Sequence, residues 1–246
     1  MQRHQIVSQG EWLLARKAHL AREKELTHMR DAIAAERRAL PWVKIEKDYV
    51  FDAPEGRKSL AELFGDKSQL IVNHFMLGPG WKDGCVGCSF GADHVEGVLV
   101  HLAQRDVAYV AVSRAPLAEI EAYRKRMGWH FAWVSSFGSD FNYDFHVSFR
   151  PEELANKRAE YNYEMIDPGI DELPGYSVFA SNDAGEVFHT YSSFGRGAEA
   201  LLGTYALLDM TPKGRDETGP RGALTDWVKR HDEYDSKSER AACCHS

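Results

Sequence analysis

LIVNHFMLGPGWKDGCVGCSF, residues 70–90, decides the fold of this chain, because an apolar strand pattern gives way there to a turn and then to two cysteines. The run 70–76 is mostly apolar and includes the β-branched Ile71 and Val72, which is typical of a buried strand, and the GPG at 78–80 predicts the turn that ends it. From Cys85 to Gln104 apolar residues recur at roughly helical spacing. We therefore expect a helix to begin at Cys85.

A second strand pattern, Val107 to Val112, follows this helix and completes a βαβ unit, whose crossover is expected to be right-handed. Strand and helix signals continue to alternate along the rest of the domain. They predict a strand at 49–51, a helical turn at 60–64, a helix at 116–127, a strand at 131–134, a hairpin of 176–179 with 187–191, and a helix at 198–208. This alternation indicates an α/β fold.

The N-terminal region differs from the rest, because helix-forming residues dominate from Gln9 to Arg38 without a proline. Its patchy apolar face predicts one long helix or two consecutive ones, with docking as the ordinary role. The LPW at 40–42 marks the exit, since the residue before a proline disfavours helical geometry. We divide the chain into an N-terminal helical extension (1–45), the α/β domain (46–210) and a charged, turn-rich C-terminal segment with a tail (211–246).

The composition limits the classes of function. With 30 Lys and Arg against 37 Asp and Glu, the formal net charge is -7, which argues against a general affinity for nucleic acid or an anionic membrane. No apolar run approaches the roughly 18 residues of a membrane span, and no signal-peptide pattern is present, so we expect a cytoplasmic protein. Four cysteines in 246 residues are too few for a disulfide scaffold, which favours catalytic or metal-binding roles for them.

Cys85 and Cys88 form a Cys-X-X-Cys pair at the expected start of the helix. Unpaired backbone N–H groups and the helix dipole stabilise a thiolate there, so Cys85 is the expected nucleophile. Two intervening residues place Cys88 about one turn further on, where it can resolve a mixed disulfide. The same spacing also occurs in zinc sites and among cysteines that are simply buried in a core, so metal binding and plain burial stay open as alternatives.

The stretch 74–90 resembles the signature of the thioredoxin-like family catalogued as domain of unknown function 899, and the resemblance extends over roughly residues 5 to 235. Further matching segments are EWL at 11–13, RRALPW at 37–42, FNYD at 141–144, HTYS at 189–192 and DMTPKGR at 209–215. The resemblance implies a thioredoxin-like fold, with a central mixed sheet flanked by helices, an N-terminal helical extension and an irregular C-terminal segment. It also implies a role as a dithiol-disulfide oxidoreductase.

The surroundings of the dithiol differ from those in the best-known thioredoxins. Trp81 stands four residues before Cys85 instead of directly before it, and Val86-Gly87 replaces Gly-Pro, so the redox potential cannot be carried over. The comparison with thioredoxins gives Pro174 the position of their cis-proline, and both isomers of its peptide bond stay open. Peroxiredoxins share the fold but have Thr or Ser where this chain has Lys82, and copper-delivery relatives space their cysteines by three residues. Both classes are therefore disfavoured.

Charged residues elsewhere are candidates for supporting roles. Arg196, Lys213 and Arg215 form a candidate anion site, since such side chains bind carboxylate or phosphate, although ordinary solvated charges are the favoured interpretation. Asp93 and His94 follow the dithiol on its helix, where they can exchange protons with the resolving cysteine.

Two further motifs have an ordinary interpretation. DFNYDFH at 140–146 alternates polar and aromatic residues and predicts a half-buried strand, and a calcium loop is disfavoured because Phe145 replaces its turn glycine. In the C-terminal segment we expect a short helical stretch at 224–228. Cys243 and Cys244 are expected to be a fortuitous pair, with an electron relay or a metal site as the alternative.

The expected function is that of a thioredoxin-like dithiol-disulfide oxidoreductase without an organic cofactor or metal. Its substrate would be a disulfide-containing protein or a small thiol compound, and a cellular thiol reductant would restore the dithiol. The alternatives are a non-enzymatic ligand- or protein-binding module of the same fold, and thirdly a metal-binding thiol protein. The long helix can dock on its own domain or on a second copy, so a homo-oligomer stays open.

Overall fold

The computed structural model describes residues 4–217 and 226–234, which fall into two units, Met1–Trp42 and Val43–Ser246. The first unit contains one continuous helix, α1 (Gln9–Arg38), which confirms the single-helix alternative. Ser8 begins it with a capping box, since its hydroxyl accepts from the Glu11 amide while the Glu11 carboxylate accepts from the Ser8 amide. The second unit carries the sheet and the dithiol.

The central sheet of the second unit has eight strands in the order β1-β10-β9-β4-β5-β6-β2-β3. β4, β5 and β6 are parallel, whereas β9 runs antiparallel to β4 and forms a hairpin with β10. The strands are β1 (Val43–Lys44), β2 (Val50–Ala53), β3 (Gly56–Ser59), β4 (Gln69–His74), β5 (Val107–Ser113), β6 (Ala132–Ser135), β9 (Gly175–Ser181) and β10 (Val187–Phe194). This mixed sheet, with its βαβ unit and C-terminal hairpin, confirms the thioredoxin-like α/β fold.

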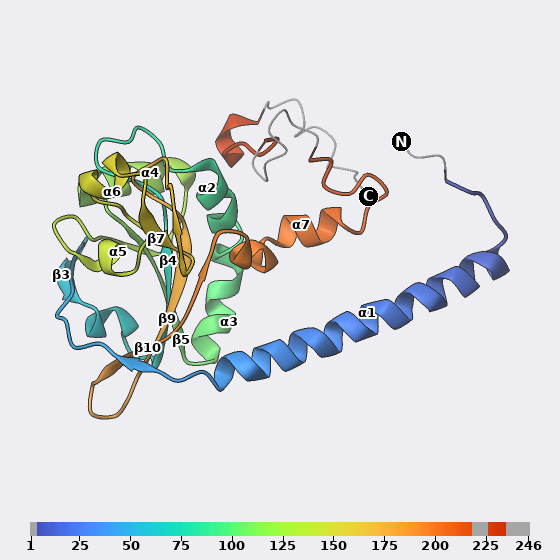
Figure 1. Ribbon diagram of the computed structural model, residues 1–246, viewed down its shortest axis with the longest axis horizontal. Coiled ribbons are helices and arrows are strands. Elements are labelled where there is room, and N and C mark those ends of the chain that lie inside the picture. Colours follow the sequence, from blue (N-terminus) through green and yellow to red (C-terminus); the bar gives the residue numbers. More distant parts are fainter. Residues whose placement is uncertain (1–3, 218–225, 235–246) are drawn as a thin grey trace, which may run out of the picture. The chain divides into compact units, whose positions relative to one another are not determined.

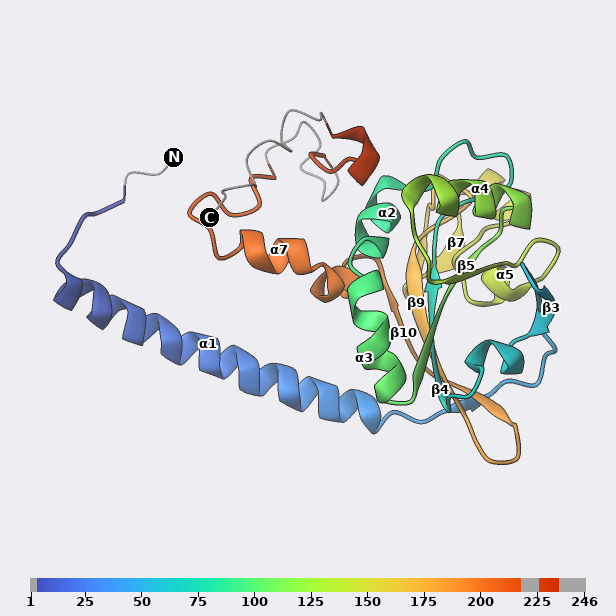
Figure 2. The same cartoon turned by 180° about the vertical axis from the view of Figure 1, so that it is seen from behind.

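Helices cover both faces of the sheet, and α2 and α3 lie on the side opposite α5 in both views (Figures 1 and 2). The helices are α2 (Val86–Ala92), α3 (Leu99–Gln104), α4 (Leu117–Met127), α5 (Phe141–Asp144), α6 (Pro151–Ala155) and α7 (Gly203–Leu208), with 3₁₀ turns η1 (Ala61–Phe64), η2 (Glu96–Val98), η3 (Gly195–Leu201) and η4 (His231–Glu233). A small hairpin of β7 (Ala159–Tyr161) and β8 (Glu164–Ile166) stands beside the main sheet.

Alternation along β4 divides the core into two clusters. Leu70 and Val72 point to one face, called here the α5 face, where they pack with Phe141 of α5 and Phe179 of β9. On the other, the α4 face, Ala111 and Trp133 pack with Phe75, which directly follows β4, and with Ile120 and Tyr123 of α4. The dithiol belongs to the α4 face, because Cys88 packs against that second cluster.

The strand predicted for residues 140–146 is wrong, because Phe141–Asp144 forms the short helix α5. Helical spacing brings Phe141 and Phe145 onto one side, with ring centroids 4.6 Å apart, and buries both in the α5-face cluster. Tyr143, which a strand would have buried with them, lies instead under the Arg150 guanidinium at 4.3 Å. The joint burial of Phe141 and Phe145, four residues apart, therefore outweighs the strand preference of the alternating pattern.

Three predicted helices differ in detail. The helix expected at 198–208 is divided into the 3₁₀ turn η3 and the helix α7. The helix expected from Cys85 to Gln104 is divided into α2, η2 and α3. Of the stretch at 224–228, the first two residues lie outside the described residues, and 226–228 are not helical. Cys243 and Cys244 also lie outside the described part of the chain. No helix among the described residues is long and apolar enough to cross a membrane.

Candidate functional site

Cys85 is the N-cap residue of α2, directly beyond the loop that leaves β4. Its amide donates to the Met76 carbonyl at 3.0 Å, which fixes the start of the helix to the end of the strand. Its own carbonyl accepts both the amide (2.9 Å) and the hydroxyl (2.8 Å) of Ser89. The sulfur therefore stands at the amino end of the helix, where backbone N–H groups are unpaired.

Gly84 is needed immediately before the nucleophile because there is no room for a side chain. A Cβ at this position would lie 2.6 Å from the Phe75 ring and 2.8 Å from the Tyr123 ring. The loop thus presses its backbone onto the aromatic cluster of the α4 face, and this contact sets the path of the chain into Cys85.

The two cysteines have opposite protonation preferences. The pKa of Cys85 is lowered to about 6, chiefly by a hydrogen bond from the Cys88 thiol, with help from the amides of Cys88 and Gly87 and the charge of Arg230, against the effect of burial. The pKa of Cys88 is raised well above its ordinary value because its thiol donates to Cys85, because it is buried, and because Cys85 and Glu172 are negative. Both are free thiols in the structure. Both are partly buried, and their shifted pKa values favour a thiolate at Cys85 and a protonated thiol at Cys88.

Arg230, from the C-terminal segment, completes the surroundings of Cys85. Its guanidinium donates to the Gly84 carbonyl through Nε (3.1 Å) and Nη2 (2.6 Å), and through Nε to the Tyr123 hydroxyl (3.0 Å). Tyr123 in turn shares a hydrogen bond of 2.9 Å with Ser89. Sequence reasoning missed Arg230, since it lies in a segment without periodic signal.

The C-terminal segment is held over the start of α2 by further contacts. Arg126 of α4 bonds both Asp83, two residues before Cys85, and Asp232 of η4, the latter at 2.7 Å. Val228 is buried against Phe90 of α2. These contacts explain how a residue 145 positions away reaches the dithiol loop, and they make the described part of this segment a component of the site.

Asp93 and His94 make hydrogen bonds that join α2 to its neighbours, and proton exchange with the dithiol stays a prediction. The Asp93 carboxylate accepts from Trp129 Nε1 at 2.9 Å and pairs with His231 Nδ1 at 2.7 Å. His94 Nε2 accepts from the Thr204 amide at 3.0 Å, so its Nδ1 carries the proton and donates to the Phe90 carbonyl at 2.7 Å. Both ring nitrogens of His94 are thereby occupied.

Trp81 and Pro174 lie in two different loops, and a role for either at the dithiol stays a prediction. The Trp81 ring folds back over Gly78, where a Cβ would lie 2.9 Å from its Nε1, and it packs with the cluster that contains Cys88. Pro174 precedes β9, and its peptide bond is trans, so the cis alternative is wrong. Its carbonyl accepts from the Tyr161 hydroxyl at 2.7 Å.

Glu172 is a buried carboxyl that sequence reasoning missed. It accepts from Arg114 Nε at 2.6 Å and from the Ser148 hydroxyl at 2.7 Å. Burial raises the pKa of Glu172 to about 7, against the lowering effects of Arg114 and Ser148. Its charge is one of the influences that keep Cys88 protonated.

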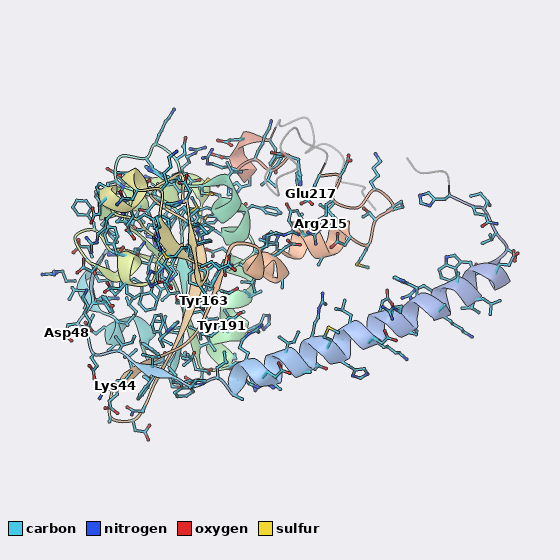
Figure 3. All side chains as sticks on the ribbon, in the orientation of Figure 1. Lys44, Asp48, Tyr163, Tyr191, Arg215 and Glu217 are labelled. Atoms are coloured by element: carbon cyan, nitrogen blue, oxygen red, sulfur yellow. The ribbon has the colours of Figure 1, made fainter. Side chains whose placement is uncertain are left out.

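The candidate anion residues are engaged with carboxylates of their own segment. Arg196 and Arg215 both pair with Glu199. Arg215, which is labelled in Figure 3, also pairs with Asp209 at 2.7 Å and lies over the Tyr205 ring at 4.4 Å. Lys213 is exposed nearby. Anion binding there stays a prediction. Within residues 4–217 and 226–234, no group of three or more His, Cys, Asp or Glu is arranged to hold a metal ion.

Comparison with known proteins gives one family match. The model of the family described as bacterial protein of unknown function (DUF899) matches residues 1–234. None of the curated proteins matches the chain.

Similar solved structures include peroxidoxin BcpB from Mycobacterium tuberculosis (12% identity, covering 67% of this chain and 95% of that one, TM-score 0.42). A mutant peroxiredoxin Q of Xanthomonas campestris has 13% identity over 64% of this chain and 90% of its own, with a TM-score of 0.43. A putative protein disulfide isomerase from Bacteroides thetaiotaomicron has 14% identity over 70% and 92%, with a TM-score of 0.39. At these values the likenesses decide nothing about function.

Proposed function

The chain belongs to this bacterial family of unknown function, and we propose that it is a thiol-disulfide oxidoreductase with Cys85 as nucleophile and Cys88 as resolving thiol. The observation that carries the proposal is the position of Cys85 as the N-cap of α2, with the Cys88 thiol donating to its sulfur. A thiolate is the attacking species in disulfide exchange, and a pKa of about 6 makes Cys85 largely ionised at neutral pH.

The reaction balances without an organic cofactor. The Cys85 thiolate attacks one sulfur of a substrate disulfide, forms a mixed disulfide and releases the other sulfur as a thiol after protonation. Cys88 then loses its proton and attacks the Cys85 sulfur, which releases the second substrate thiol and leaves the Cys85–Cys88 disulfide. A dithiol reductant returns two electrons and two protons to restore the pair.

The contact between the two cysteines supports a fall in the pKa of Cys88 at the step in which Cys88 attacks the mixed disulfide. In the free reduced pair, the hydrogen bond to Cys85 and the negative charge of Cys85 both raise the pKa of Cys88. Once Cys85 is in a mixed disulfide its sulfur carries no charge, so both influences disappear. Cys88 therefore becomes easier to ionise only when a mixed disulfide waits for attack.

The test uses the full chain with Cys243→Ser and Cys244→Ser, so that the tail thiols do not react. With an oxidised glutathione substrate, Cys88→Ser is expected to accumulate a mixed disulfide on Cys85, visible by intact mass, whereas Cys85→Ser forms none. The background protein is expected to show a reversible two-electron couple in a dithiol redox buffer.

Retention of disulfide reduction by Cys85→Ser would contradict the proposal. Absence of a reversible couple in the background protein would equally contradict it, and would leave the fold as a binding module.

A further inference from the structure

A cavity of about 300 Å³ opens on the α5 face, away from the dithiol. Phe145 and Phe194, which line it, belong to the α5-face cluster, whereas Cys88 packs on the α4 face. The cavity lies where β10, the end of α5 and the β7–β8 hairpin meet. Its volume is at the lower end of the range for small-molecule sites.

A hydrogen-bonded chain of polar side chains runs from the cavity into the core. His189 Nε2 bonds the Ser192 hydroxyl at 2.7 Å, and both residues line the cavity. Ser192 bonds Ser177 at 2.8 Å, and Ser177 bonds His74 Nε2 at 2.8 Å. Burying polar side chains in an aromatic core costs free energy unless they are hydrogen-bonded. These four side chains satisfy one another, and His189 and Ser192 bring hydrogen-bonding groups to the cavity wall.

Tyr163 covers the cavity from a strained position. It lies at the tip of the β7–β8 hairpin with φ of 66°, next to Asn162 at 52°. Both central residues of such a turn need positive φ, which suits asparagine but is unfavourable for tyrosine. Its hydroxyl donates to the Ser192 carbonyl at 3.2 Å and its ring meets Phe194 edge-on at 5.7 Å, so these contacts hold the strained residue in place.

The charged side chains of the cavity wall favour a cation. Asp144 and Glu160 line it, and no Lys or Arg is among its described lining residues. Asp144 is already held by Lys47 at 2.7 Å. The Glu160 carboxylate, in contrast, has the His146 ring at 3.9 Å as its one ion-pair partner among the described residues, and both side chains are about half exposed. Glu160 therefore supplies a carboxylate beside aromatic rings.

We propose that this cavity binds a small organic ammonium ion, with Phe145, Tyr163 and Phe194 as aromatic walls and Glu160 as the counter-charge. Aromatic faces attract ammonium groups through the ring quadrupole, and a nearby carboxylate adds to that attraction. His189 and Ser192 offer hydrogen bonds to a hydroxyl or amine of the same ligand. The site is independent of the dithiol, because the two lie on opposite faces of the sheet.

The test compares choline with 3,3-dimethylbutan-1-ol, which has the same shape but no charge, and with benzoate as an anionic aromatic. Binding to the full reduced chain is followed by calorimetry and by changes in tyrosine and histidine NMR signals. Choline is expected to bind roughly tenfold more tightly than the neutral alcohol, and benzoate more weakly than either. The same ranking is expected in Cys85→Ser, where the dithiol is inactive.

Matched variants locate the site. Glu160→Gln is expected to weaken choline binding about fivefold, whereas Glu164→Gln, on the facing strand of the same hairpin but outside the cavity wall, leaves it unchanged. Tyr163→Ala is expected to weaken binding about fivefold, whereas Tyr163→Phe, which keeps the ring, stays within about twofold.

Three results would each overturn the proposal: no choline binding at millimolar concentrations, equal affinity for the neutral alcohol, or equal effects of Glu160→Gln and Glu164→Gln. Near-ultraviolet circular dichroism of each variant verifies that the fold is kept.

Discussion

Cys85 and His74 both lie close to the end of β4, but on opposite faces of the central sheet. Their surroundings have opposite effects on the charged form of each side chain. On the α4 face, two backbone amides and a thiol donate to Cys85, and the Arg230 guanidinium, which donates to the Gly84 carbonyl, adds a positive charge nearby. On the α5 face, His74 is 1% exposed and packs beside the Phe141 and Phe145 rings, whose centroids are 5.6 and 5.8 Å away. One environment stabilises a charged form and the other excludes it.

The difference shows that donors, more than depth, decide which protonation state a site keeps. Burial lowers the pKa of His74 to about 3, with a smaller effect from His189, so His74 stays neutral. Burial works against ionisation of Cys85 too, but the hydrogen bond from Cys88 and the local amides outweigh it, and its pKa falls to about 6. Both pKa values are lowered, but a lowered pKa makes the Cys85 thiol anionic and keeps the His74 imidazole neutral.

The largest expected effect that tests this contrast is the acid sensitivity caused by His74. Its pKa is lower in the folded state than the ordinary 6.5 of the unfolded chain, so its contribution to stability is present above pH 6.5 and is lost as the pH falls toward 3. Between pH 7.5 and pH 4.5 the free energy of unfolding is expected to fall by about 3 kcal/mol from this group alone. Urea unfolding of the wild type and of His74→Gln at both pH values measures it.

The comparison of His74→Gln with the wild type controls for the other titrating groups, because these contribute equally to the pH dependence of both proteins. Glu172, for example, has a raised pKa, so its contribution is present below pH 4.5 and is lost as the pH rises toward 7, opposite to that of His74. The pH dependence of His74→Gln minus that of the wild type isolates the histidine. Identical slopes in the two proteins would mean that His74 is protonated in the folded state.

The sequence predicted the elements of the fold well, since periodicity and turn residues mark them directly. The strand before the dithiol, the βαβ unit and the hairpin of β9 and β10 follow from local patterns. The strand predicted at 140–146 was wrong because two phenylalanines four residues apart pack together in a helix. In such a short segment, packing in the three-dimensional core decides between the strand period of about 2 residues and the helix period of about 3.6 residues.

The second effect concerns how tightly the α4 face fixes the dithiol loop. Gly84→Ala places a methyl group within 2.6 Å of the Phe75 ring, so we expect a loss of about 2 kcal/mol in the free energy of unfolding and a slower reaction of Cys85 with iodoacetamide. Gly97→Ala is the matched control, because nothing lies within 4 Å of a Cβ there. Equal unfolding midpoints for the two variants would mean that the loop is not held by the ring.

The residues around the dithiol were much harder to predict than the fold. Their contacts join positions far apart in the chain: Gly84 with Arg230, and Arg114 with Glu172. No local pattern signals such pairs, since a lone arginine in a charged segment or a glutamate in a loop is ordinarily solvated. His74 is buried, but its Nδ1 has no hydrogen-bond partner among the described residues.

The smallest expected effect is the contribution of Arg230 to the Cys85 thiolate. Its charge is the last of the five influences on the pKa of Cys85, after the hydrogen bond from Cys88, burial and the two amides. Arg230→Gln removes the charge, so the thiolate fraction at pH 5, below the pKa of about 6, is expected to fall roughly threefold. The rate of iodoacetamide alkylation in the Cys243→Ser, Cys244→Ser background reports this fraction. Arg196→Gln is the control, since Arg196 pairs with Glu199 on a different segment. An equal rate in both variants would show that the amides and Cys88 alone set the thiolate, and that Arg230 only anchors the Gly84 carbonyl.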